Sequence, residues 1–197
     1  MAIASLIIAI IAILIALGSV AYTRRQTVAS ERLTAIEVLR RHEDLTPELD
    51  IRCTYFAGGD VTLELELIGP TGLDRLDEVR VRIRNDRPDR TTPRPGNGLT
   101  AEQLADAIWG PYRLKPEVRD TDRLGREHGP FILPRQEPYK LSLEPSTVPS
   151  WFTVPEMWRR DFEGAPIRLE ITCRREGYEP WVLLREITPI DPVKTVW

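Results

Sequence analysis

The side chains able to perform acid–base or metal chemistry are few in this chain of 197 residues, which has two histidines and two cysteines. His42 precedes Glu43 and Asp44, and all three could bind a metal ion. A metal site needs three or more converging ligands, and nothing else nearby supplies them. We therefore interpret this group as the solvated end of a helix. His128 lies in the sequence GREHGP, where we also expect a solvated loop histidine.

Motifs for catalysis or cofactor binding are missing from the sequence. It has no Gly-x-Ser-x-Gly elbow, Gly-rich phosphate loop or His-Glu-x-x-His helix. The stretch Asp120–Gly125 resembles the start of a calcium loop, but Phe131 stands where the bidentate glutamate is required. Carboxylate pairs such as Asp120 and Asp122 could act as acid and base only inside a cleft. We predict no catalytic, cofactor-binding or metal-binding residue, and we do not expect an enzyme.

The N-terminal residues form the most specific feature of the chain. Residues 2–22, AIASLIIAIIAILIALGSVAY, carry no charge and are followed by Arg24 and Arg25. As a helix this run spans roughly 30 Å, the thickness of the hydrocarbon core of a bilayer. Signal-peptide cleavage after Ser19–Ala21 is the alternative, but no Lys or Arg precedes the run and it exceeds the usual apolar length. The sequence thus predicts a transmembrane anchor over residues 1–22.

The flanking charges predict how the anchor is oriented. Because Lys and Arg beside a membrane helix stay in the cytoplasm, Arg24 and Arg25 place the N-terminus outside and the rest of the chain inside the cell. Cys53 and Cys173 would then be free buried thiols. In the opposite orientation, an exported envelope module that binds a cell-wall or small ligand, the two cysteines could form a disulfide.

Small residues follow one face of the predicted anchor at alternating spacings of three and four. They are Ala2, Ser5, Ala9, Ala12, Ala16 and Ser19. Small side chains allow close approach of helices in lipid, so this stripe could support a weak homodimer. The alternative is that Ala is simply common in such anchors, and we expect weak or no dimerisation through the stripe.

The charge of the remaining chain argues against nucleic-acid binding. Residues 26–197 contain 25 basic and 30 acidic residues, and the two signs are interleaved. A nucleic-acid binder would instead show a cluster of basic residues. The length suits one domain of ordinary size. We divide it into a juxtamembrane linker over residues 23–47, with a helix over Thr27–Leu45 that ends before Pro47, and a domain over residues 48–197.

Alternation of apolar and polar residues predicts about seven short strands in the domain. They are Leu49–Phe56, Val61–Ile68, Val79–Ile83, Phe131–Leu133, Tyr139–Leu143, Ile167–Arg174 and Trp181–Ile187. Short strands without intervening helices indicate a mainly β fold, an antiparallel immunoglobulin-like β-sandwich. If the second strand pairs with the third, Glu64 and Glu66 would meet Arg80, Arg82 and Arg84 in a cross-strand charge ladder.

Two short helices are predicted beside these strands, and aromatic residues accompany them. Thr100 and Gln103 form a capping box for the first helix, and the second covers Thr153–Phe162. Trp109, Tyr112 and Trp151 are candidate contacts for a protein partner, because interfaces favour such aromatics. Exposed edge strands could also accept a strand of that partner. The alternative is that the aromatic rings fill the core.

The order of several stretches resembles a group of uncharacterised, membrane-anchored proteins of high-GC actinobacteria. After the apolar run these are AIEVLRRHEDLTPELDIRC, GPTGLDRLDEVRVRIRND and IWGPYR. The resemblance implies a single-pass anchor followed by a recurring β-domain, and it supplies no activity or site residue. We therefore expect a membrane-anchored protein whose β-domain is a protein-interaction module at the cytoplasmic face.

Overall fold

The computed structural model describes residues 36–56, 59–84, 98, 100–162 and 164–190. The chain divides into two units, residues 1–44 and 45–197. In the first unit residues 36–44 are helical, within the helix predicted for the linker. The anchor over residues 1–22, its small-residue stripe, and Arg24 and Arg25 lie outside the described residues. Among the described helices, none combines the length and the apolar character that a membrane crossing requires.

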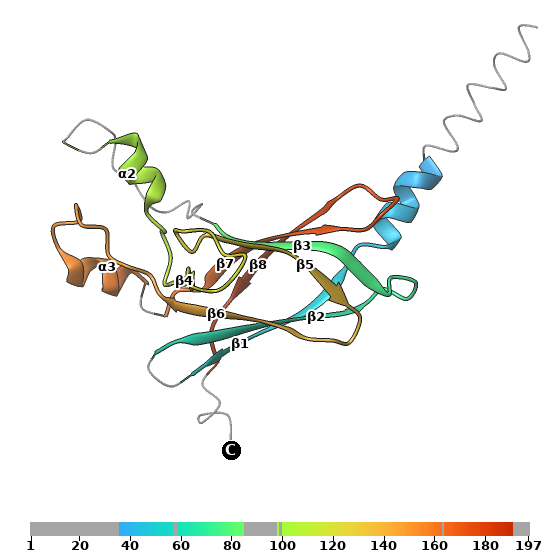
Figure 1. Ribbon diagram of the computed structural model, residues 1–197, viewed down its shortest axis with the longest axis horizontal. Coiled ribbons are helices and arrows are strands. Elements are labelled where there is room, and N and C mark those ends of the chain that lie inside the picture. Colours follow the sequence, from blue (N-terminus) through green and yellow to red (C-terminus); the bar gives the residue numbers. More distant parts are fainter. Residues whose placement is uncertain (1–35, 57–58, 85–97, 99, 163, 191–197) are drawn as a thin grey trace, which may run out of the picture. The chain divides into compact units, whose positions relative to one another are not determined.

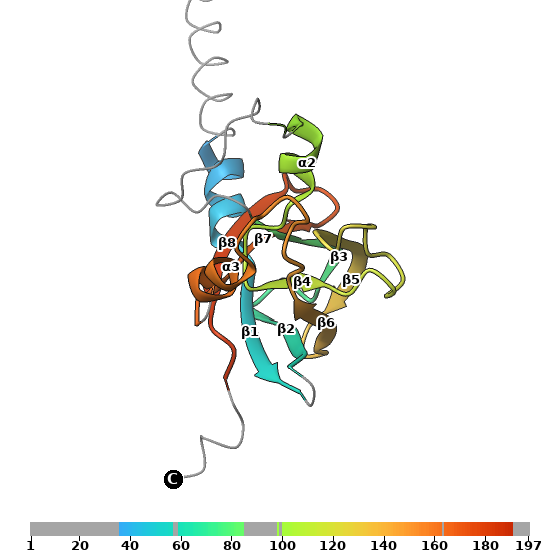
Figure 2. The ribbon, with the colours of Figure 1, turned by 90° about the vertical axis from the view of Figure 1, so that its left-hand side faces the viewer.

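The second unit is a β-sandwich of two four-stranded antiparallel sheets (Figures 1 and 2). The first sheet has the order β1-β2-β6-β4 and the second the order β5-β3-β7-β8. The strands are β1 (Glu48–Tyr55), β2 (Val61–Gly69), β3 (Arg75–Ile83), β4 (Tyr112–Leu114), β5 (Glu127–Pro134), β6 (Tyr139–Pro145), β7 (Ile167–Arg174) and β8 (Trp181–Ile187). The prediction of a mainly β domain is therefore confirmed.

Alternating side chains from both sheets form one apolar core between them. On β2 the leucines at positions 63, 65 and 67 are fully buried, and on β7 Leu169 and Ile171 are equally buried. Burial of each such side chain contributes about 1.5–3 kcal/mol, so the period-two pattern accounts for the packing of the two sheets. Cys53 and Cys173 also point into this core, as the alternation predicted.

The condition for the cross-strand charge ladder, pairing of β2 with β3, is not met. β2 lies between β1 and β6, whereas β3 belongs to the other sheet, because the chain crosses between the sheets after Gly69. Glu64 and Glu66 therefore do not face the arginines of β3.

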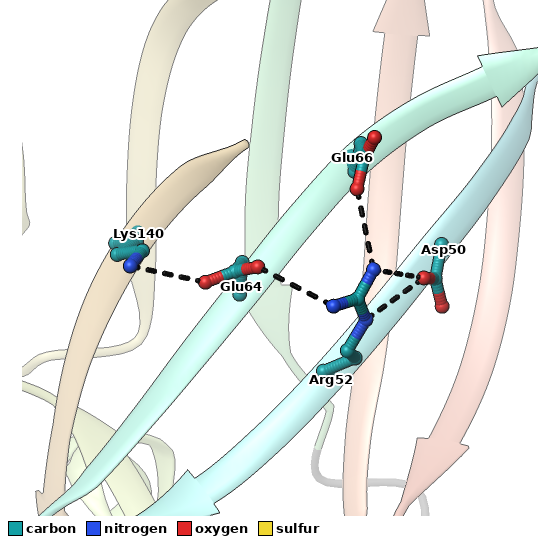
Figure 3. A network of polar contacts seen from close by, with 5 residues as sticks. All are labelled: Asp50, Arg52, Glu64, Glu66 and Lys140. Atoms are coloured by element: carbon teal, nitrogen blue, oxygen red, sulfur yellow. Dashed lines mark hydrogen bonds and ion pairs between the residues drawn. The ribbon is translucent and has the colours of Figure 1, made fainter. Parts of the chain in front are cut away.

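The two glutamates lie instead in a charge network on the outer face of the first sheet (Figure 3). Arg52 Nη2 lies 3.3 Å from Glu66 Oε2 and 2.7 Å from Asp50 Oδ2, and Lys140 Nζ lies 3.2 Å from Glu64 Oε2. Such exposed pairs contribute at most about 1 kcal/mol each, and they solvate the sheet.

Two short helices, α2 (Ala101–Asp106) and α3 (Pro155–Phe162), lie at the end of the sandwich where β4 is found (Figure 1). The predicted capping box of α2 is confirmed. The Gln103 amide donates to Thr100 Oγ1 at 3.1 Å, and the Thr100 amide donates to Gln103 Oε1 at 2.9 Å. β4 was not predicted, because three residues after Gly110 and Pro111 are too few to show an alternation.

Candidate functional site

An aromatic cluster at this end of the sandwich brings together rings from three segments. It contains Trp109, Trp151, Phe152, Trp158 and Phe162, with Leu104 and Ala107 of the α2 region packed against them. Trp158 is at its centre, with ring centroids 5.1 Å from Trp109, 5.3 Å from Phe152 and 4.9 Å from Phe162. The aromatic cluster is separate from the main core. It acts as a second, smaller core that holds α2 and α3 to the sheets.

Polar contacts fix the aromatic cluster to the strands. Arg126, just before β5, donates through Nη2 to the carbonyl oxygens of Ala105 and Ala107 at the C-terminal end of α2, the second at 3.3 Å. A cation suits that helix end. The amide of Ser146 donates to the carbonyl oxygen of Pro111 at 3.0 Å, and its hydroxyl donates to the carbonyl of Gly110. The segment that carries Trp109 is thus hydrogen-bonded to Arg126 at one end and to Ser146 at the other.

Two adjoining cavities lie beside the aromatic cluster and share Tyr112 and Phe162 in their walls. The first has a volume of about 280 Å³ and reaches Ile83 and Arg168, at the ends of β3 and β7. The second has a volume of about 460 Å³ and includes Tyr55 of β1. Because their walls come from both sheets and from α3, this end of the sandwich presents a hollow that mixes aromatic and polar groups.

A further hollow of about 370 Å³ lies on the Trp151 side of the aromatic cluster, lined also by Gln103 and Arg113. Arg113 forms an ion pair with Glu144, with Nη2 and Oε1 at 2.6 Å. Both partners are about three-quarters buried, so the pair holds its geometry better than a freely solvated one. This hollow therefore has one aromatic wall and one fixed charged wall.

The three aromatic residues predicted as partner contacts come together at this end but differ in exposure. Trp109 and Trp151 contact each other with centroids 5.7 Å apart. Trp109 is only 7% exposed and contributes mainly to packing. Tyr112 and Trp151 are half-buried. Burial and a hydrogen bond with Tyr55 raise the pKa of Tyr112, so its hydroxyl stays neutral and can donate or accept a hydrogen bond.

His128 is not the solvated loop residue that we expected. It lies on β5, is 2% exposed, and its two ring nitrogens lie 2.8 Å from Thr121 Oγ1 and 3.0 Å from Tyr139 Oη. Burial lowers its pKa, and the charge of Asp120 offsets this only partly. The sequence GREHGP suggested a loop, and alternation could not have identified His128, because it is out of phase with Phe131 and Leu133. An irregularity in the pairing of β5 with β3, between His128 and Phe131, places its side chain in the core. His128 is therefore a neutral, hydrogen-bonded core residue.

The aspartates of the calcium-loop-like stretch and the two cysteines have structural rather than ligand-binding surroundings. Asp122 Oδ1 accepts hydrogen bonds from the amides of Arg126 at 2.5 Å and Glu127 at 3.1 Å, which closes the turn before β5. Over the described ranges no three His, Cys, Asp or Glu side chains are grouped to hold a metal ion. Cys53 and Cys173 are free thiols on different sheets, and burial raises the pKa of each to about 12.

These features define a two-sheet antiparallel β-protein with an aromatic second core and hollows beside it. No family model matches the chain, and no curated protein matches it. The resemblance to anchored actinobacterial proteins accordingly stays a prediction.

Proposed function

We propose that this chain is a single-pass membrane protein whose β-sandwich binds another protein through the aromatic cluster and the hollow beside it. The apolar run of residues 2–22 and the following Arg24 and Arg25 support the anchor and a cytoplasmic domain. The resemblance to anchored actinobacterial proteins agrees with this arrangement.

We infer further that the sandwich has an immunoglobulin-like topology. With the edge strand β5 set aside, the sheets read β1-β2-β6-β4 and β3-β7-β8. In chain order these match the ABED and CFG sheets of the immunoglobulin constant-type fold. The cysteines differ from the immunoglobulin pattern, because Cys173 lies on the equivalent of strand F whereas β2, the equivalent of strand B, carries none. Many domains of this architecture present binding surfaces at the ends of the sheets.

The observation that carries the binding proposal is the position of two half-buried aromatic rings, Tyr112 and Trp151, each in the wall of a hollow. Partly exposed Tyr and Trp in pockets are the residues that most often dominate protein–protein affinity. The two adjoining cavities lined by Tyr112 suit a protein segment that inserts an apolar side chain and offers a hydrogen-bonding group to the Tyr112 hydroxyl. A nucleic acid is disfavoured by the net negative charge of the domain.

The test uses the full chain in detergent extracts. A photoreactive crosslinker is placed at Arg159, which lines the cavity of about 460 Å³ together with Tyr112. The unaltered protein should give one defined crosslinked product. Tyr112→Ala and Trp151→Ala should reduce that product at least about tenfold, as expected for residues that dominate an interface. Tyr178→Ala is the control, because Tyr178 is also a half-buried aromatic but lies in the turn between β7 and β8. Equal products from all four proteins would refute the proposal.

Orientation requires an added thiol, because buried Cys53 and Cys173 would escape labelling on either side of the membrane. Ile132 on β5 is 59% exposed, so Ile132→Cys provides an accessible thiol. We expect a membrane-impermeant maleimide to label it in lysed cells and not in intact cells. Labelling in intact cells would establish the exported alternative instead, and recovery of the full chain without membranes would refute the anchor.

A further inference from the structure

Among the edge strands of the described sheets, β8 is the one best suited to pair with another strand. β5 contains Pro130 and Pro134, which lack the N–H group that a sheet edge must donate. β4 has only three residues, and the edge of β1 is met at Thr54 by a bridge to Ile190. β8 has seven residues without proline, and no other described strand pairs with its outer side.

The outward side chains of β8 add apolar surface to this edge. Val182 is 57% exposed and Leu184 is 49% exposed, on the outer face of the second sheet. Leucine and valine on a long, uncovered edge strand favour association, which is why edges are usually protected by charges or proline. Arg185 Nη1 donates to the carbonyl oxygen of Leu184 at 2.9 Å, a bond that the amide of an added strand can replace.

The sequence of β8 is complementary to itself when the strand is turned through a two-fold axis. With Leu183 on the axis, Val182 faces Leu184 of a second copy, and Leu184 faces that copy's Val182. The four side chains then form one apolar patch. Moving the axis by one residue to Leu184 sets Val182 against Glu186, which loses that match. Direct apolar pairs across antiparallel strands stabilise the pairing, so one register is preferred.

We propose that β8 pairs antiparallel with β8 of a second copy of this chain, with Leu183 on the two-fold axis. The second sheets of the two copies would then form one continuous eight-stranded sheet. The strand that pairs with this edge thus comes from a second copy of the same protein. A two-fold arrangement is the commonest one for homodimers. The proposed protein-binding end at Tyr112 and Trp151 is a different surface, which stays open in such a dimer.

A single edge pairing is small compared with a stable dimer interface, which buries about 800 Å² on each partner. In dilute solution we therefore expect weak association. Confinement of both copies to one membrane raises their effective concentration and can make weak pairing sufficient. This last step rests on the anchor of the proposed function, whereas the register of the pairing does not.

The test is disulfide crosslinking of the full chain in membranes of expressing cells, with copper phenanthroline as oxidant. Two differently tagged chains are co-expressed, one with Val182→Cys and the other with Leu184→Cys. In the proposed register these thiols face each other, whereas two copies of either variant alone hold them two residues out of register. Ile132→Cys is the matched control on the other edge of the same sheet, with similar exposure. The native thiols are buried and give little background.

We expect the mixed pair to yield at least about fivefold more dimer than either variant alone, because only it places the thiols directly opposite. We also expect Ile132→Cys to yield only collisional background. Loss of pairing is tested separately with the double variant Val182→Lys, Leu184→Lys, which places charged side chains on the apolar patch. Its dimer signal in an energy-transfer assay should fall to that of unrelated membrane proteins.

A mixed pair that crosslinks no better than Ile132→Cys would overturn the proposal, as would more dimer from Leu184→Cys alone than from the mixed pair. A double-lysine variant that keeps the energy-transfer signal would overturn it too. These results are independent of the proposed binding function. That function is tested separately, by the photocrosslinks of Tyr112→Ala and Trp151→Ala.

Discussion

Replacement of Trp158 by alanine tests whether the aromatic cluster is a second core. Trp158 is 2% exposed and contacts the rings of Trp109, Phe152 and Phe162. A buried tryptophan removes up to about 250 Å² from water, which at 25 cal/mol per Å² is worth about 6 kcal/mol. Residual burial in the unfolded chain reduces this. We therefore expect Trp158→Ala to lower the free energy of unfolding by about 3–5 kcal/mol.

The matched control is Met157→Ala, because Met157 is the neighbouring residue of α3 and is 45% exposed. We expect its cost to stay below about 1 kcal/mol. Denaturant unfolding followed by circular dichroism measures both values on the full chain in detergent. Hydrogen exchange then locates the loss, which should affect the amides of α2 and α3 more than those of β2 and β7. The reasoning is refuted if the two variants differ by less than about 1 kcal/mol.

The remaining predictions concern β5 and its neighbours. The pKa of His128 is lower in the folded than in the unfolded chain, so as the pH falls the unfolded chain takes up the proton first. The contribution of neutral His128 to the free energy of unfolding is therefore fully present above about pH 6.5 and decreases below it. The fall from this residue is at most about 1.4 kcal/mol per pH unit and should vanish in His128→Gln but persist in His42→Gln, as read from unfolding midpoints at pH 5 to 7.5. Gly129 has φ +118°, and an added Cβ would lie 2.6 Å from the carbonyl oxygen of Val79. Gly129→Ala should therefore cost at least about 2 kcal/mol more than Gly177→Ala, where φ is also positive but the space is open; equal melting losses would contradict this.

The strands could be predicted from sequence where one face is buried along their whole length. β7 and β8 have the bounds that the alternation predicted, because period two is the direct consequence of a half-buried strand. The sequence also predicts that β1 and β2 form a hairpin, because AGGD separates their two alternating segments, and this pairing is confirmed. The other pairings could not be predicted in the same way. The link from Gly69 to Arg75 resembles a hairpin turn in sequence, yet it carries the chain to the other sheet. Local patterns do not encode that choice, because it depends on how the two sheets bury their apolar faces.

The candidate site was predictable only in its components. The sequence identified Trp109, Tyr112 and Trp151 as a group and left open whether each contacts a partner or fills the core. It did not single out Trp109 as the buried one, nor show that Tyr112 begins a strand. The helix predicted over Thr153–Phe162 includes Trp158 and Phe162, but nothing in the sequence indicates what they pack against. Contacts between segments far apart in the sequence set these roles, as Arg126 illustrates by binding the end of α2 from the start of β5.

Burial keeps several titratable side chains of the described residues in their neutral forms. Burial shifts the pKa of Tyr112, Tyr139 and both cysteine thiols upward and that of His128 downward. Each shift favours the neutral form, whereas a nucleophile or an activated thiol needs its charged form to be stabilised. Neutral phenol and indole groups in a hollow are well suited to hold a protein segment by packing and hydrogen bonds. Of these groups Tyr112 lines the cavities at the proposed binding surface, where its neutral hydroxyl is suited to a hydrogen bond with a partner.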